Sequence, residues 1–215
     1  MHGIIISGEY DELAHRNLCE LEIPVVALGN YQLGEMPWAA CEIDLAQGVR
    51  TVVRRLSDLG HKRFGLLLRS FGTEYQLKLQ RWFEWEVAQE KRENAGIAIE
   101  ATEGSVRNSL MGLLKSPNRP SVLFFESDTM AEEVYDTCAE LKLSIPRDIS
   151  LVTFGDGRHI LRPSLASVQV QLQDYGAAAL EKLAGMIDDP DRTLTREIFP
   201  MRFVPGGSIS AYTEA

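Results

Sequence analysis

The stretch SVLFFESDTMAEEVYDTCAELKLSIPRDISLVTF, residues 121–154, places two short apolar runs on either side of a segment with helical period. The runs at 121–125 and 149–154 are mostly apolar, which is typical of strands that helices cover on both faces of a sheet. Between them, apolar side chains recur at the spacing of one helix face, at Met130, Val134, Cys138 and Leu141. The stretch therefore predicts a strand, a helix with Cys138 in the core, and a second strand parallel to the first.

The same alternation continues in both directions along the chain. Apolar runs typical of buried strands lie at 3–7, 23–29, 64–68, 96–100 and 197–204. Segments with helical period lie at 11–21, 47–59, 75–95, 106–114 and 172–187. Alternating strands and helices of this kind predict an α/β fold with doubly wound parallel sheets. In such sheets, ligands bind beyond the carboxyl ends of the strands.

Composition and charge exclude several classes of protein. The 215 residues include 22 Lys and Arg and 31 Asp and Glu, so the net charge is −9 and the chain has no general attraction for nucleic acid or an anionic membrane. Three widely spaced cysteines predict no disulfide framework and a reducing compartment. No apolar run reaches the roughly 18 residues of a membrane span, and the N-terminus does not resemble a signal peptide. We therefore expect a cytoplasmic protein with no membrane partner.

Motifs for catalysis or metal binding are absent from the sequence. There is no glycine-rich phosphate loop and no nucleophile elbow, and the four histidines do not have metal-ligand spacing. Gly60 is placed to end the helix at 47–59, and His61 after it is expected to be a cation at the negative end of that helix. The sequence therefore predicts no metal, no cofactor and no catalytic residue, so we do not expect an enzyme.

One candidate for ligand binding is an arginine among aromatic residues. Arg81 stands beside Trp82, Phe83 and Trp85. A guanidinium next to flat apolar faces suits a polyhydroxylated or anionic small molecule. The alternative is an apolar helix face with Arg81 on the surface.

A second candidate lies directly after two predicted strands. Glu126, Ser127 and Asp128 follow the strand at 121–125, and Gly155 and Asp156 follow the strand at 149–154. Polar groups at strand ends can receive a ligand. The alternative is that Ser127 or Asp128 caps the following helix.

Several motifs in a fixed order resemble one family. The segment IDLAQGVRTVVRRLSDLGHKRFGLL (43–67) is similar to a signature of the lactose and purine repressor (LacI) family of transcriptional regulators. Other segments follow in the family's order, namely GIIISG (3–8), IPVV (23–26), R-x-x-x-W (81–85), RPSVLFFESDTMA (119–131), LKLSIPRDISLVTFGD (141–156), PSLASVQVQLQDYGAAALEKL (163–183) and FVPGGSIS (203–210). The likeness covers essentially the whole chain.

This resemblance implies an effector-binding domain of the type I periplasmic-binding-protein-like fold, with two α/β lobes and a small effector between them. The first lobe would comprise 1–69 and about 169–195, the second lobe 70–168, and a closing strand and tail 196–215. In the family, a DNA-binding helix-turn-helix and two βα units precede the segment that resembles 3–8. The resemblance therefore implies an incomplete first lobe and no DNA-binding headpiece in these residues.

The resemblance also implies a function and a site. The function is sensing of a small effector, a carbohydrate or a derivative, and dimerisation within a regulator, with no direct DNA binding by this chain. The implied effector-binding residues are Arg81, Trp85, Ser127, Asp128 and Asp156. Glycine stands at position 155, where the family has an aspartate, so that a carboxylate opposite the arginine is lost. We therefore expect an anionic sugar derivative to be preferred over a neutral sugar.

Three other functions remain open at the level of the sequence. The fold also suits a free-standing sugar-binding protein, an enzyme on an α/β scaffold, or a degraded regulator that binds no effector.

Overall fold

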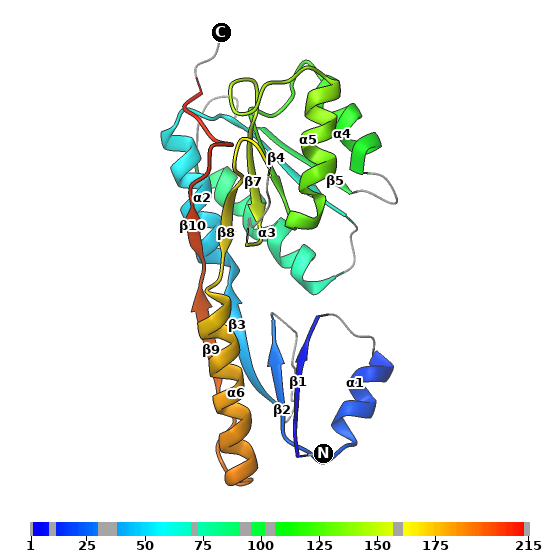
Figure 1. Cartoon of the computed structure of the whole chain (residues 1–215), viewed down its shortest axis with the longest axis vertical. Coiled ribbons are helices and arrows are strands. Elements are labelled where there is room, and N and C mark those ends of the chain that lie inside the picture. The colour runs from blue at the N-terminus through cyan, green and yellow to red at the C-terminus, as the bar shows by residue number, and fades with distance from the viewer. Residues whose placement is uncertain are drawn as a thin grey trace. The chain divides into compact units, whose positions relative to one another are not determined.

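The computed structural model describes residues 2–8, 12–29, 38–69, 73–90, 96–101, 106–156 and 161–212. The chain divides into two compact units. Unit 1 contains Met1–Asp44, Thr73–Tyr75 and Val170–Pro200, and unit 2 contains Leu45–Gly72, Gln76–Gln169 and Met201–Ala215. Each unit has its own sheet with helices on both faces (Figure 1).

Unit 1 is built on a four-stranded parallel sheet in the order β1-β2-β3-β9. Its strands are β1 (Ile4–Ser7), β2 (Val25–Leu28), β3 (Ala39–Asp44) and β9 (Arg196–Pro200), and its helices are α1 (Glu12–Cys19) and α6 (Leu172–Asp188). Alternate strand residues point to opposite faces. Val26 and Cys41 therefore pack with α6, and Ala27 and Trp38 pack on the other face with Leu18 of α1.

Unit 2 is built on a six-stranded sheet in the order β10-β8-β7-β6-β4-β5. Its strands are β4 (Arg63–Leu68), β5 (Gly96–Ala101), β6 (Val122–Phe125), β7 (Ser150–Phe154), β8 (Ala166–Gln169) and β10 (Arg202–Val204). The strands are parallel except β10, which runs antiparallel to β8. The helices are α2 (Leu45–Asp58), α3 (Glu74–Gln89), α4 (Val106–Lys115), α5 (Ala131–Glu140) and the short 3₁₀ helix η1 (Asp128–Met130).

The central strand β6 shows how the core of unit 2 is arranged. Leu123 and Phe125 belong to one apolar cluster with α4 and α5, in which Cys138 is fully buried as expected. Phe124 points to the other face and meets Phe83 of α3 edge to face, with ring centroids 5.1 Å apart. The expected α/β fold with doubly wound parallel sheets is confirmed.

The structure divides the chain differently from the expected lobe boundaries. We expected the first lobe to extend to residue 69, but Leu45–Gly72 belong to unit 2. The reason is that β4 pairs with β5 and β6, and that α2 packs on β8 and β10. The segment 196–215 is also divided, because β9 pairs with β3 in unit 1 and β10 pairs with β8 in unit 2.

The end of α2 follows the expected pattern at Gly60 but not at His61. Gly60 has a φ of +93°, and its amide and that of His61 donate to Ser57 O and Leu56 O, the two bonds of a Schellman motif. His61 is not the expected helix-end cation, because its side chain turns inward and is almost fully buried. Nε2 of His61 lies 3.1 Å from Ser210 O, and Nδ1 lies 3.0 Å from Ser121 Oγ.

Burial lowers the pKa of His61 and keeps the imidazole neutral. The carbonyl of Ser210 can only accept, so Nε2 carries the proton and Nδ1 is an acceptor for the Ser121 hydroxyl. The single proton of that hydroxyl has the carbonyl of Arg63, at 3.2 Å, as a second acceptor.

In the part of the chain that the structure describes, no helix is both long and apolar enough to cross a membrane.

The pKa of His61 predicts a pH dependence of stability. As the pH falls below about 6.5, the unfolded chain takes up the proton before the folded chain does. The free energy of unfolding should therefore decline with falling pH, by at most about 1.4 kcal/mol per pH unit, until the folded-state pKa is passed. Urea unfolding between pH 8 and pH 5 measures this slope.

The matched control is His61→Gln, whose amide can donate to Ser210 and accept from Ser121 without titrating. The variant should show a shallower slope over the same pH range. Equal slopes in the two proteins would contradict the account, because the other histidines are common to both.

Candidate functional site

Three neighbouring strands of unit 2 end at one edge of the sheet in polar residues. Glu126, Ser127 and Asp128 follow β6, Gly155 and Asp156 follow β7, and Arg69 follows β4. Because β4, β6 and β7 are parallel neighbours, their carboxyl ends lie side by side. We refer to this part of unit 2 as the carboxyl edge.

The residues after β6 and β7 are in close contact. A Cβ atom added to Gly155 would lie 3.2 Å from Cγ and 3.3 Å from Oδ1 of Asp128. Both spacings are tighter than most real Cβ contacts, so the glycine allows the Asp128 carboxylate to lie against the end of β7. The structure thus brings Asp128 and Gly155 together at the carboxyl edge.

Glu126 joins three elements at the carboxyl edge. Its side chain is buried, and Oε1 accepts a hydrogen bond of 2.9 Å from the backbone amide of Arg69. Oε2 accepts a bond of 2.7 Å from the side-chain amide of Gln76 on α3. The carboxylate therefore connects the end of β6 to the end of β4 and to the first turns of α3.

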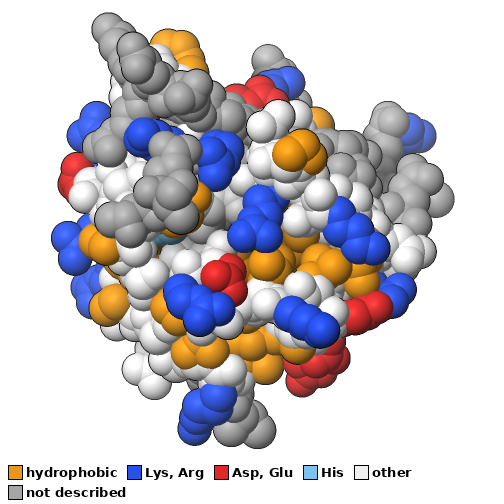
Figure 2. Space-filling model, turned by 90° about the horizontal axis from the view of Figure 1, so that it is seen from above, with side chains coloured by type: hydrophobic (Ala, Val, Ile, Leu, Met, Phe, Trp, Pro, Cys, Tyr) orange, Lys and Arg blue, Asp and Glu red, His pale blue; other side chains and the backbone are white. Residues whose placement is uncertain are grey.

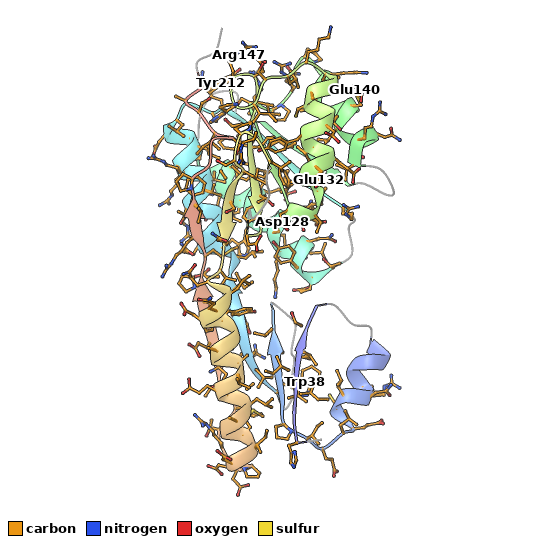
Figure 3. All side chains as sticks on the ribbon, in the orientation of Figure 1. Trp38, Asp128, Glu132, Glu140, Arg147 and Tyr212 are labelled. Carbon is orange, nitrogen blue, oxygen red and sulfur yellow. The ribbon has the colours of Figure 1, made fainter. Side chains whose placement is uncertain are left out.

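Ser127 is the cap of the helical segment after β6. It has an extended backbone, and its Oγ accepts from the amide of Thr129 at 3.3 Å. Asp128 is the first residue of η1, which leads directly into α5, so Asp128 is not the cap. Figure 3 shows Asp128 at the end of unit 2 where α5 begins. Its half-buried carboxylate is placed to accept hydrogen bonds at this edge.

Arg81 and Trp85 lie on the exposed face of α3 and not on the face that packs against the sheet. The buried stripe of this helix consists of Gln76, Leu79, Phe83, Glu86 and Val87. Arg81 is two residues beyond the buried Leu79, so it is rotated by about 200° around the helix and points away from the sheet. Trp85 is 57% exposed. The structure therefore does not bring Arg81 and Trp85 together with the segments 126–128 and 155–156.

Sequence reasoning missed Arg69 and Gln76. Arg69 directly follows the predicted strand at 64–68, and its guanidinium lies 3.9 Å from Glu133 of α5. Gln76 stands on the apolar stripe of α3, three residues before Leu79. A polar residue in that register was the signal that could have identified it, because a buried amide needs a hydrogen-bonding partner.

Burial raises the pKa of the Cys138 thiol to about 12, so this cysteine is not a nucleophile at neutral pH. Among the residues that the structure describes, no group of three His, Cys, Asp or Glu side chains could hold a metal ion.

The role of Glu126 can be tested by substitution. Glu126→Ala removes the acceptor of two donors in a buried position and should lower the free energy of unfolding by roughly 2–4 kcal/mol. Glu126→Gln should cost about 1 kcal/mol or less, because the Gln76 amide can turn over and accept from the new amide. Denaturation in urea measures both values.

Glu132→Ala is the matched control, because Glu132 is an exposed carboxylate on α5. It should change the stability by no more than about 0.5 kcal/mol. An alanine at 126 that costs no more than the alanine at 132 would rule out the structural role of Glu126.

Comparisons with known proteins place the chain in a family. A family described as "Periplasmic binding protein-like domain" matches residues 53–209. The catabolite control protein A of Priestia megaterium is 26% identical over 187 residues, which cover 84% of this chain and 56% of that protein. The lactose operon repressor of Klebsiella pneumoniae is 26% identical over 207 residues, covering 95% of this chain and 58% of that protein. The chain thus spans somewhat more than half the length of these relatives.

A solved structure shares the fold. The crystal structure of a LacI family transcriptional regulator from Enterococcus faecium, with bound ribose, superposes with a TM-score of 0.84 and 20% identity, covering 98% of this chain and 80% of that chain. The expected resemblance to LacI-family regulators is confirmed by these relatives. Since the family match extends over nearly three quarters of the residues, this chain belongs to the periplasmic-binding-protein-like domain family.

Proposed function

We propose that this chain is the small-molecule-sensing domain of a LacI-family transcriptional regulator, and that a carbohydrate binds at the carboxyl edge of unit 2. The observation that carries the proposal is the contact of the Asp128 carboxylate with Gly155 across the ends of β6 and β7. Relatives that are repressors of sugar operons, and one that was solved with ribose, support the class of ligand.

The chemistry of the carboxyl edge suits a ligand with many hydroxyl groups. An ionised carboxylate only accepts hydrogen bonds, and each sugar hydroxyl can donate one. Asp128 and Asp156 supply such acceptors, and Ser127 supplies a hydroxyl that already orders the start of η1. We keep these three residues in the proposed site.

We leave Arg81 and Trp85 out of the proposed site, and this changes the expected ligand. The preference for an anionic derivative depended on Arg81 facing the end of β7. Arg81 points away from the sheet, and the Arg69 guanidinium at the carboxyl edge lies near the Glu133 carboxylate. We therefore propose a neutral carbohydrate, whose binding needs no unpaired cation.

We also infer that the chain acts by binding rather than by catalysis, in the cytoplasm, without contacting DNA itself. A second copy of the chain is the expected partner. Large apolar side chains on the surface of unit 1 support association, because Leu180 of α6 and Ile198 of β9 are each 62% exposed.

Titration calorimetry with ribose, glucose and their phosphates tests the ligand proposal. A neutral sugar should bind, and Asp128→Asn should weaken its binding roughly 10- to 150-fold, the loss expected for charge-assisted hydrogen bonds. Asp136→Asn is the matched control, because Asp136 is an exposed aspartate on the following helix. The proposal fails if no neutral sugar binds or if the two variants bind equally well.

Light scattering at micromolar concentration tests the partner proposal. We expect a particle with twice the mass of the single chain, whether or not sugar is present. A particle with the mass of one chain would show that the exposed apolar side chains of unit 1 do not drive association.

A further inference from the structure

Unit 2 has a pocket at the end of its sheet opposite the carboxyl edge. The pocket has a volume of about 470 Å³, within the range of small-molecule sites. Its lining includes Arg63, the first residue of β4, and residues that follow α4 and α5. It therefore lies at the amino ends of the strands, whereas Glu126 and Asp128 lie at the carboxyl ends.

Three cationic side chains line the pocket, and none of the described lining residues is acidic. Arg63, Lys115 and Arg119 contribute three positive charges. The C-terminal ends of α4 and α5 oppose them with about half a negative charge each. Glu140 interacts electrostatically with Lys115. Its carboxylate, however, accepts two hydrogen bonds of 2.9 and 2.6 Å from the Arg107 guanidinium.

Two of the polar groups of the pocket are held in place. The Arg63 guanidinium donates to Arg119 O at 3.0 Å and to the Tyr212 hydroxyl at 3.1 Å. The Tyr212 ring stacks on the buried His61 with centroids 5.4 Å apart, and its amide donates to Leu59 O. A guanidinium fixed in this way loses little further freedom when it binds an anion.

The rest of the lining consists of Ser116 and four apolar residues. The apolar residues are Leu114, Pro117, Leu141 and Leu143. Figure 2 looks onto this end of unit 2 and shows Lys and Arg side chains around apolar surface. The combination fits a molecule with a charged group at one end and an apolar or ring-shaped body at the other.

We propose that this pocket is a second ligand site of the protein, which takes a small organic anion with a phosphate or carboxylate group. Arg63, Lys115 and Arg119 hold the anionic group by charge-assisted hydrogen bonds. The leucines and Pro117 contact the apolar body. The site is separate from the carboxyl edge, so an anion and a sugar can be bound at once.

Calorimetric titration with phenyl phosphate, in buffer free of other multivalent anions, tests the proposal. Wild type should bind phenyl phosphate more tightly than inorganic phosphate or phenol, because the pocket offers both cations and an apolar wall. Arg119→Gln should weaken binding at least tenfold. Lys115→Gln, at an exposed side chain, should act in the same direction and serves if the first variant does not fold. A parallel titration with benzoate shows which anionic group is preferred.

Two control variants locate the binding. Arg202→Gln also removes one positive charge. Arg202 is exposed and lies opposite Gln169 in the strand register, at the carboxyl end of β8, so this variant should bind phenyl phosphate as wild type does. Asp128→Asn should also leave it unchanged, which distinguishes the pocket from the carboxyl edge. The proposal is overturned if wild type does not bind phenyl phosphate, if inorganic phosphate binds as tightly, or if Arg119→Gln and Lys115→Gln both bind like Arg202→Gln.

Discussion

The buried carboxylate of Glu126 is the contact on which the arrangement of the candidate site depends. A carboxylate taken out of water is costly unless donors replace the lost hydration. Here the donors come from two other elements, the backbone of Arg69 after β4 and the side chain of Gln76 on α3. The end of β6 is thereby fixed, and with it the start of η1, where Asp128 faces the glycine after β7.

The same strands of unit 2 position two sites of opposite character. The carboxyl ends present acceptors, and the amino ends present cations beside leucines. The net charge of the whole chain conceals this difference. Unit 1 contains 4 Lys and Arg against 15 Asp and Glu, whereas unit 2 contains 18 against 16. The lack of general attraction for nucleic acid and anionic membranes, which followed from the overall charge, therefore applies to unit 1 and not to unit 2.

Local sequence patterns predicted the helices and strands. Contacts between residues distant in the sequence determined how the strands pair and which polar residues are buried. The apolar runs at 121–125 and 149–154 identified buried strands because both faces of each strand are covered. The partner of the strand at 64–68 could not be read from that strand, so its lobe was assigned wrongly. His61 looked like a surface cation because its partners, Ser121 and Ser210, are distant in the sequence. Arg81 was predicted as a site residue because of its residue type, whereas Gln76 was not predicted because it stands on an apolar stripe.

The most direct test of the central claim is hydrogen exchange of the backbone amides with and without a saturating neutral sugar. The account predicts that exchange slows at residues 126–130 and 155–156, because the ligand contacts the ends of β6 and β7 and stabilises η1. The exchange of residues 81–85 should stay the same. Protection at 81–85 with no change at 126–130 would contradict the account and place the ligand on the outer face of α3.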